Sequence, residues 1–189
     1  MPTEKKELFL TFDDGPVTGP TEFVISELRK YDAKASFFCI GDNVRKHPSV
    51  FEKVVADGHR IGNHTFNHLK GWSTPLKDYV ENIAMCDTQI AGAGKGEAKY
   101  FRPPYGRITP GQIRAIRENY SIVMWDVLTH DYAKNLSVTN CLRGSISAAR
   151  PGSIVVFHDS LKAERNLSFV LPRFLEHFAA QGYAFSALL

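Results

Sequence analysis

Two histidines, His64 and His68, stand at a spacing that suits metal binding. In a helical segment, side chains four positions apart share one face, within about 6 Å of each other. A divalent ion takes imidazole nitrogens from such a pair, and Asp14 offers a hard carboxylate oxygen. Two histidines and one carboxylate leave coordination positions open for water and substrate, as a catalytic zinc site needs. We therefore predict that Asp14, His64 and His68 bind a divalent metal ion, with zinc as first choice and cobalt or nickel as alternatives.

A second set of ionisable residues is suited to proton transfer. Asp13 is adjacent to Asp14, so one carboxylate can bind the metal while the other accepts a proton. His158 directly follows the apolar run 153–157. A buried structural histidine is the alternative there, but the ionisable residues at the ends of the other apolar runs favour a proton donor. Arg102 precedes two prolines and is predicted to clamp a carboxylate through two parallel hydrogen bonds.

Short β-branched and aromatic runs alternate with segments of helical period, and these elements must position the ionisable residues. The predicted strands cover residues 8–12, 35–40, 60–63, 100–102, 121–125, 153–157 and 183–186. The predicted helices cover residues 22–31, 48–56, 75–91, 109–119, 138–149 and 168–181. This alternation predicts a parallel sheet covered by helices, and both an open doubly wound sheet and a closed barrel fit. Because sites in such folds form at the carboxyl ends of the strands, we expect the ionisable residues to meet there.

The composition indicates one globular domain that spans residues 1–189. The chain has a mass of 21.2 kDa, with 43% hydrophobic and 23% charged residues, which is ordinary for a soluble protein. No apolar run approaches the roughly 20 residues that a membrane span needs. The net charge is +3 and no cluster of Lys and Arg stands out, which argues against nucleic acid or a membrane as partner. The sequence does not indicate an oligomeric state.

Three other features of the sequence carry no chemistry of their own. The polar segment 1–7 lacks the apolar region of a signal peptide, which predicts a cytoplasmic protein, or an envelope or secreted one if a targeting segment has been removed. The glycine-rich stretch 92–96 follows a predicted helix, and Glu97 stands where a phosphate-binding loop needs lysine, so we predict a helix end and a loop. Cys39, Cys86 and Cys141 form no C-x-x-C pair and are predicted to be buried thiols.

Four motifs in order give the chain a resemblance to a known family. They are Thr11-Phe12-Asp13-Asp14-Gly15-Pro16, His64-Thr65-x-x-His68, Arg102-Pro103-Pro104-Tyr105-Gly106, and an apolar strand that ends in His158. Together they resemble the polysaccharide deacetylases of the NodB-homology type, carbohydrate esterase family 4, over about residues 8 to 189. The resemblance implies an α/β fold, a distorted and incomplete (β/α) barrel with about seven parallel strands.

The resemblance also assigns roles to the candidate residues. It implies zinc or a similar ion on Asp14, His64 and His68. It implies that Asp13 is the general base and Arg102 orients it, that His158 is the general acid, and that the backbone N–H of Tyr105 helps to bind the oxyanion.

The family has a further motif between the Arg102 motif and the strand that ends in His158, usually counted as its fourth. This motif departs from its usual form in this sequence. The family commonly has Asp-Ser-x-Asp followed by Trp or Tyr, whereas this chain has Leu128-Thr129-His130-Asp131-Tyr132. If the alignment holds, Leu128 occupies the first aspartate position and Asp131 is the remaining carboxylate of the motif. We therefore expect Asp131 to face the site and to hydrogen-bond to His158 or Arg102.

The implied activity is metal-dependent removal of acetyl groups from N-acetylated amino sugars in a β-linked glycan, which releases acetate. An O-acetyl xylan esterase or a small-molecule amidohydrolase on the same site remains an alternative, and so does a noncatalytic carbohydrate-binding protein. A serine hydrolase is disfavoured because Ser160 is too close in sequence to His158 and no G-x-S-x-G motif occurs. Four aromatic residues are candidates for stacking on a sugar, with core packing as the equal alternative: Trp72, Tyr105, Trp125 and Tyr132.

Overall fold

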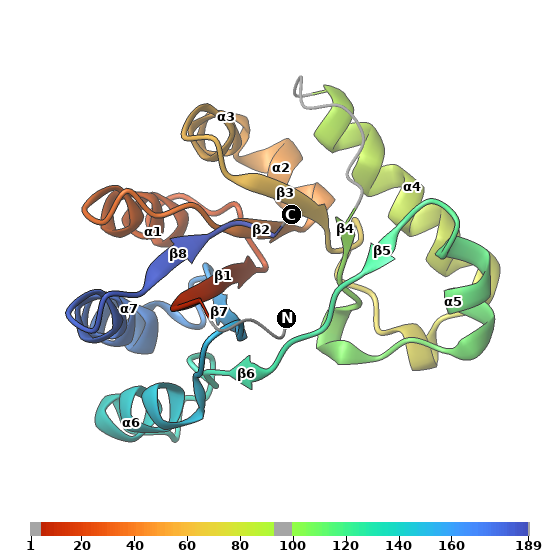
Figure 1. The fold of residues 1–189 in the computed structure, drawn as a ribbon. Coiled ribbons are helices and arrows are strands. Elements are labelled where there is room, and N and C mark those ends of the chain that lie inside the picture. The colour runs from red at the N-terminus through yellow and green to blue at the C-terminus, as the bar shows by residue number, and fades with distance from the viewer. Residues whose placement is uncertain (1–4, 93–99, 189) are drawn as a thin grey trace.

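A single parallel sheet with helices around it makes up the fold in the computed structural model, which describes residues 5–92 and 100–188 (Figure 1). The strands are β1 (Glu7–Asp13), β2 (Ser36–Cys39), β3 (Arg60–Asn63), β4 (Tyr100–Phe101), β5 (Ser121–Ile122), β6 (Val127–Leu128), β7 (Ile154–His158) and β8 (Ala184–Ser186). The α-helices are α1 (Pro20–Arg29), α2 (Gly41–Lys46), α3 (Pro48–Ala56), α4 (Leu76–Gly92), α5 (Pro110–Ile116), α6 (Val138–Ala148) and α7 (Glu164–Ala179). Two 3₁₀ turns, η1 (Gly71–Ser73) and η2 (Pro104–Gly106), follow β3 and β4.

The strand order is β5-β4-β3-β2-β1-β7-β6, and β8 pairs with β1. Every pairing is parallel. The path ends at β5 and β6, which do not pair with each other in the described part of the chain, so the barrel is incomplete, as the resemblance implied. The order also places β1 centrally, with β2 to β5 on one side and β7 and β6 on the other.

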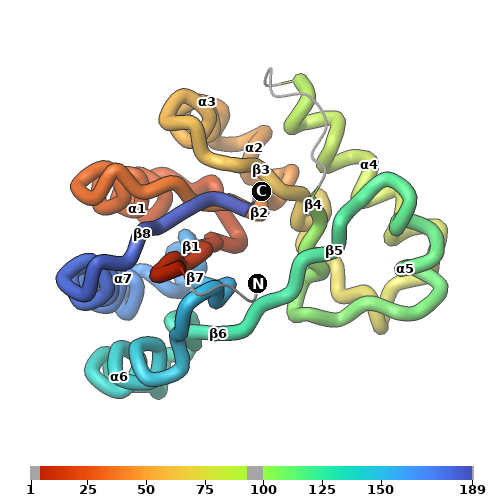
Figure 2. The backbone as a smooth tube through the Cα atoms, viewed as in Figure 1, coloured from red at the N-terminus to blue at the C-terminus, as the bar shows by residue number. Residues whose placement is uncertain are grey.

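The strand predicted at 121–125 is shorter in the structure, where β5 ends at Ile122, so the prediction is wrong for residues 123–125. The Val123 N–H still donates to Phe101 O beside β5, whereas the Asp126 N–H donates to Ile154 O at β7. The backbone therefore leaves one edge of the path and crosses to the other, as the tube in Figure 2 shows.

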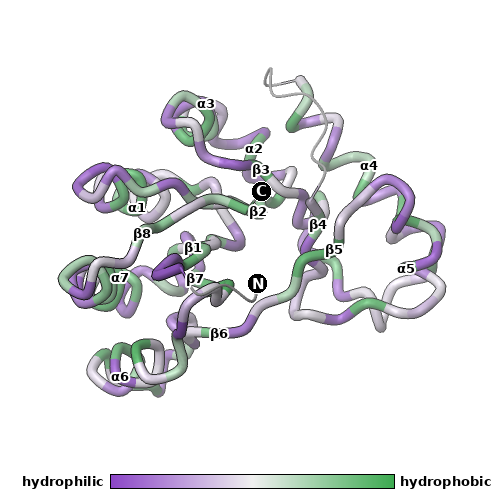
Figure 3. The backbone as a smooth tube through the Cα atoms, in the orientation of Figure 1, coloured by the Kyte–Doolittle hydropathy of each residue, from purple (hydrophilic) through white to green (hydrophobic). Residues whose placement is uncertain are grey.

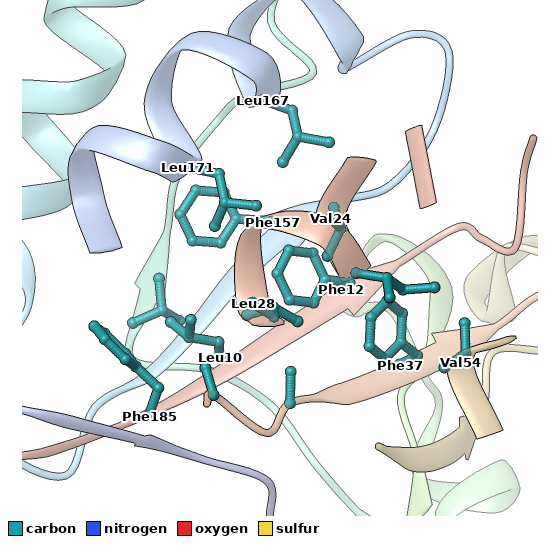
Figure 4. Packing of buried hydrophobic residues seen from close by; sticks show 14 of the residues in the cluster. Leu10, Phe12, Val24, Leu28, Phe37, Val54, Phe157, Leu167, Leu171 and Phe185 are labelled. Atoms are coloured by element: carbon teal, nitrogen blue, oxygen red, sulfur yellow. The ribbon is translucent and has the colours of Figure 1, made fainter. Parts of the chain in front are cut away.

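The main core lies between the sheet and helices α1 and α7. Parallel strands are buried on both faces, which explains the continuous apolar runs in the sequence. Leu10 and Phe12 of β1 pack with Phe157 of β7 against Val24 of α1 and Leu171 of α7 (Figure 4). The helices present hydrophilic residues outward, and the hydrophobic segments gather toward the sheet (Figure 3). This packing fixes the strands and therefore the loops at their carboxyl ends.

The predicted elements agree with the structure in most places. Residues 48–56 and 60–63 match α3 and β3 at both ends, whereas the six-residue helix α2 was not predicted and α7 begins earlier than expected, at Glu164. The three cysteines are buried and free, as predicted. Residues 93–99, which contain most of the predicted glycine-rich loop, lie outside the described residues. Within the described residues, no helix is both long and apolar enough to cross a bilayer.

Candidate metal and catalytic site

The three predicted metal ligands meet at the carboxyl ends of β1 and β3. Asp14 follows β1, and His64 and His68 follow β3, with one potential ligand atom from each within 4.8 Å of the others. Asp14 Oδ1 lies 3.7 Å from His64 Nε2 and 3.2 Å from His68 Nε2. The prediction that the segment from His64 to His68 is helical is wrong, because Thr65 and His68 have left-handed φ values of 64° and 56°. The two imidazole rings nevertheless lie 5.0 Å apart.

Polar side chains take the place of helical hydrogen bonds in the loop after β3. Asn63 Oδ1 accepts the N–H of Thr65 at 2.8 Å. Asn82 Oδ1, on α4, accepts the N–H groups of Phe66 and Asn67, each at 2.9 Å. Because these amides lie on neighbouring elements, the loop that carries the histidines is fixed by the fold.

The donor set fits a divalent metal ion. The Oδ1 atom of Asp14 is buried and accepts no hydrogen bond of good geometry from a described residue, although His68 Nε2 lies 3.2 Å away, and a buried anion in that state is unfavourable unless a cation neutralises it. His64 Nδ1 lies 2.7 Å from the carbonyl oxygen of Arg102, so Nδ1 carries the proton and Nε2 is free to bind a metal. Burial lowers the pKa of His64 to about 4, which keeps the ring neutral. Burial alone would raise the pKa of Asp14, but the contact with His68 and the positive charge of His158 keep that pKa below its usual range. Metal ligands must be deprotonated in this way.

Asp13 is held by the fully buried guanidinium of Arg102. Arg102 Nη1 donates to Asp13 Oδ1 at 2.7 Å and to Thr11 Oγ1 at 2.8 Å. The predicted bidentate clamp is wrong, because Nε donates to Val123 O at 3.2 Å and Nη2 to Met124 O at 3.0 Å. The side chain of Arg102 thus ties Asp13 to the crossing between β5 and β6, and its charge lies against a single carboxylate oxygen.

His158, at the end of β7, is held by Asp131. Asp131 Oδ1 lies 2.7 Å from His158 Nδ1, and Oδ2 accepts the His158 N–H at 2.8 Å. This is the contact expected from the altered fourth motif, in which Leu128 lines the cavity without a charge. Burial alone would lower the pKa of His158, but the charge and hydrogen bond of Asp131 raise it to about 9. The ring is therefore a cation at neutral pH, with Nε2 available to donate.

Tyr105 stands at the tip of η2 in a left-handed conformation, with φ 60°. Its residue surface is 61% exposed, and its ring lies 4.6 Å from that of His68. No hydrogen bond to a described residue uses its backbone N–H. The Tyr105 N–H is thus a free donor among the described residues, on a residue that lines the same cavity as the metal ligands, and its contact with an oxyanion stays a prediction.

Asp159 is a positioning residue that the sequence reasoning missed. This fully buried carboxylate accepts the Gly15 N–H at 3.0 Å and the Thr21 hydroxyl at 2.6 Å. A Cβ atom on Gly15 would lie 1.9 Å from Asp159 Oδ2, so only glycine fits there. Asp159 therefore fixes the turn that carries Asp13 and Asp14. Its place after an apolar strand was visible in the sequence, but no spacing pointed across the sheet to Gly15.

One cavity of about 850 Å³ brings these groups together. Six of the eight predicted metal and catalytic residues line it: Asp13, Asp14, His64, His68, Tyr105 and His158. Arg102 and Asp131 are buried behind Asp13 and His158, respectively, and hydrogen-bond to them.

A metal-ligand triad beside a held carboxylate and a held imidazole, on an incomplete (β/α) barrel, defines a metal-dependent hydrolase. The chain belongs to the polysaccharide deacetylase family, whose model, described as "Polysaccharide deacetylase", matches residues 1–123. The resemblance drawn from the motifs is therefore confirmed.

Curated relatives and a solved structure agree with this assignment. Two proteins of Bacillus cereus, each named peptidoglycan-N-acetylglucosamine deacetylase, are 32% identical over 84% of this chain and 33% identical over 98% of it. The chain spans 58% of the length of the first and 87% of the second. A chitooligosaccharide deacetylase of Azorhizobium caulinodans is 33% identical over 82% of this chain and 74% of its own length. The crystal structure of the Bc1960 peptidoglycan N-acetylglucosamine deacetylase superposes with a TM-score of 0.93 at 29% identity, covering 99% of this chain and 88% of that one.

Proposed function

We propose that this protein removes acetyl groups from the nitrogen of N-acetylated amino sugars in β-linked glycans and releases acetate, with zinc as its metal. The observation that carries the proposal is the meeting of the Asp14, His64 and His68 triad with two separately held proton-transfer groups, Asp13 and His158, in one cavity. The names of the relatives, which act on peptidoglycan and chitooligosaccharides, support the choice of substrate.

The residues of the chain divide the hydrolysis between them. A divalent ion held by Asp14, His64 and His68 would supply Lewis-acid polarisation of the acetyl carbonyl and would lower the pKa of a water molecule in the site. Asp13 accepts a proton from the attacking water, and Arg102 orients its carboxylate. The N–H of Tyr105 donates to the oxygen that gains negative charge as the carbonyl carbon becomes tetrahedral.

His158 completes the reaction as the proton donor. An amide nitrogen leaves poorly unless it is protonated, so the step needs an acid that is still protonated at neutral pH. Asp131 keeps His158 in that form and holds the ring by its Nδ1, which directs Nε2 to the cavity. The proton moves from Nε2 to the nitrogen as the C–N bond breaks, and the products are acetate and a free amine.

Hydrolysis of O-acetyl esters is the second candidate function, and Leu128 is the observation that favours it. An apolar side chain stands in the cavity where the family commonly has a carboxylate. An alkoxide leaves more readily than an amine and depends less on a proton donor. The direct contact of Asp131 with His158 weighs against this candidate, because it keeps His158 protonated at neutral pH, and the leaving group of an ester depends less on such a proton donor.

Acetate release from matched substrates tests the proposal. We expect release from chitooligosaccharides and from peptidoglycan glycan, and little from acetylated xylan. Activity confined to acetylated xylan would overturn the assignment to nitrogen and leave the metal site in place. Asp13→Asn and His158→Ala are each expected to abolish most activity while retaining the metal, because neither residue is a ligand.

A further inference from the structure

The side chain of Asn63 joins the loop that carries the two histidine ligands to helix α4. Asn63 is the last residue of β3 and is fully buried. Its Oδ1 accepts the Thr65 N–H at 2.8 Å, and its Nδ2 donates to Ile83 O at 2.9 Å and to Asp87 Oδ1 at 2.7 Å. One amide therefore links the loop after β3 to two successive turns of α4.

The carboxylate of Asp87 helps to decide which way the Asn63 amide faces. An amide can present either its oxygen or its NH₂ group to a neighbour, whereas an ionised carboxylate and a carbonyl oxygen only accept hydrogen bonds. Because Asp87 and the carbonyl of Ile83 are both acceptors, the NH₂ group must face α4 and the oxygen must face Thr65. Loss of the Asp87 carboxylate would remove one of the two restraints on this orientation.

The hydroxyl of Tyr120 holds the carboxylate of Asp87 in turn. Tyr120 donates to Asp87 Oδ2, while the other carboxylate oxygen accepts from Asn63. Tyr120 directly precedes β5, and its ring packs edge-on against that of Phe101 in β4, with the ring centroids 6.0 Å apart. A chain of hydrogen bonds thus runs from the β5 edge of the sheet, through α4 and the end of β3, to the loop of the metal site.

The backbone of Thr65 needs this support because it is strained. Its φ of 64° is left-handed, a conformation that a β-branched residue rarely adopts. Such a conformation persists only where the surrounding structure holds it. The bond from the Thr65 N–H to Asn63 is one restraint, and Thr65 Oγ1, which accepts the Leu69 N–H at 3.1 Å, is another. Since Thr65 lies between the two histidine ligands in sequence, a change in its backbone would move them relative to Asp14.

We infer that Asp87 and Tyr120 are positioning residues of the metal site, which act through Asn63 and raise the affinity of the site for its divalent ion. Neither residue is part of the lining of the catalytic cavity. The inference rests on the metal site of the proposed function and extends its support to the far side of α4 and to β5. Residues that orient a metal ligand typically change metal affinity by about 10- to 100-fold, and we expect these more distant ones to act at or below the lower end of that range.

The affinity of the metal-free protein for Zn²⁺, measured by competition with a chromogenic chelator, tests the inference. Asp87→Ala removes the acceptor of one Asn63 hydrogen and is expected to weaken Zn²⁺ binding by about tenfold. Tyr120→Phe removes only the hydroxyl and is expected to weaken it by about threefold. Asp87→Asn retains an acceptor oxygen for Asn63 and should bind Zn²⁺ within about twofold of the wild type.

Two matched controls separate positioning of the loop from a general loosening of α4. Tyr79→Phe removes a hydroxyl from the apolar cluster against which Tyr120 packs, and this hydroxyl is buried without a hydrogen-bond partner among the described residues. Asp78→Ala removes an exposed carboxylate from the first turn of α4. Both controls should bind Zn²⁺ as the wild type does. Urea unfolding of each metal-free variant measures its loss of stability, and circular dichroism verifies that it is folded before the titration.

Wild-type affinity for Zn²⁺ in both Asp87→Ala and Tyr120→Phe would overturn the inference alone. A loss of the same size in the two controls would also overturn it, because weaker binding would then follow from any loosening of α4. If Asp87→Ala does not fold, Tyr120→Phe decides the matter, since it loses a single hydroxyl. In each of these cases, binding of Zn²⁺ by the wild type leaves the proposed metal site standing. Absence of Zn²⁺ binding by the wild type would overturn the proposed metal site together with the inference.

Discussion

Replacing Asp131 with asparagine should move the alkaline limb of the pH–rate profile to lower pH. Asparagine keeps the shape of the side chain but removes the charge that holds the pKa of His158 at about 9. Without it, that pKa falls toward the ordinary histidine value of about 6.5. The active form of a general acid is protonated, so the rate of each protein falls as pH rises through the pKa of its own His158.

The size of the effect follows from the two pKa values. At pH 8 about 90% of His158 is protonated in the wild type, against about 3% in the variant, a loss of about 30-fold. At pH 6 His158 is largely protonated in both proteins, so its titration lowers the rate of the variant relative to the wild type by less than about twofold. A bound metal ion is common to both proteins, so the difference between them remains.

The assay is kcat/KM for acetate release from pH 5 to 10. Asp126→Asn is the matched control, because Asp126 also accepts a backbone N–H, that of Ile154 at 2.9 Å, but does not contact His158. We expect the alkaline limb to move in Asp131→Asn and to stay in Asp126→Asn. Profiles of the same shape for the wild type and Asp131→Asn, whatever their heights, would refute the reasoning.

Three further predictions concern the framework of the site. Gly15→Ala should destabilise the protein by about 1–3 kcal/mol in urea unfolding and weaken metal binding, because the new Cβ collides with Asp159. The control is Gly144→Ala on α6, whose new Cβ meets no atom within 4 Å, and this substitution should be neutral or stabilising. Equal effects of the two substitutions would count against a packed turn. Arg102→Lys should cost about 3–5 kcal/mol and most of the activity, since lysine cannot reproduce the four buried hydrogen bonds of the guanidinium; a variant of unchanged stability would contradict this. The raised pKa of His158 stabilises the folded state fully below about pH 6.5, and this stabilisation is lost as pH rises through about 9, so the urea midpoint should fall over that window in the wild type and change less in Asp131→Asn.

Local patterns predicted the sheet and the residues of the site, because both depend on features that recur along the chain. β1 and β7 are apolar runs buried on both faces, and the ionisable residues that follow them meet because parallel strands share a carboxyl edge. The choice between an open sheet and a barrel depends on the pairing of distant strands, which periodicity does not report. The resemblance to the polysaccharide deacetylases supplied the prediction of an incomplete barrel.

The errors have a common physical cause in contacts across the fold. The loop from His64 to His68 is held by Asn82 of another element and adopts left-handed conformations that a helical spacing does not describe. The strand predicted at 121–125 breaks because its carbonyls accept hydrogen bonds from the buried side chain of Arg102. Those same bonds explain why Arg102 reaches Asp13 with only one nitrogen. The role of Asp159 likewise depends on a contact with Gly15 from a strand far away in sequence.

Metal binding by two adjacent carboxylate variants tests the central claim most directly. The claim is that Asp14, with His64 and His68, holds one divalent ion, while its neighbour Asp13 is held by Arg102 and acts on protons. Titration calorimetry with Zn²⁺ on the metal-free protein, with circular dichroism to verify the fold, should find about one ion per chain in the wild type and in Asp13→Asn, and a loss of affinity of at least about tenfold in Asp14→Asn. Equal affinity in Asp14→Asn and the wild type, or loss of the ion from Asp13→Asn alone, would contradict the account.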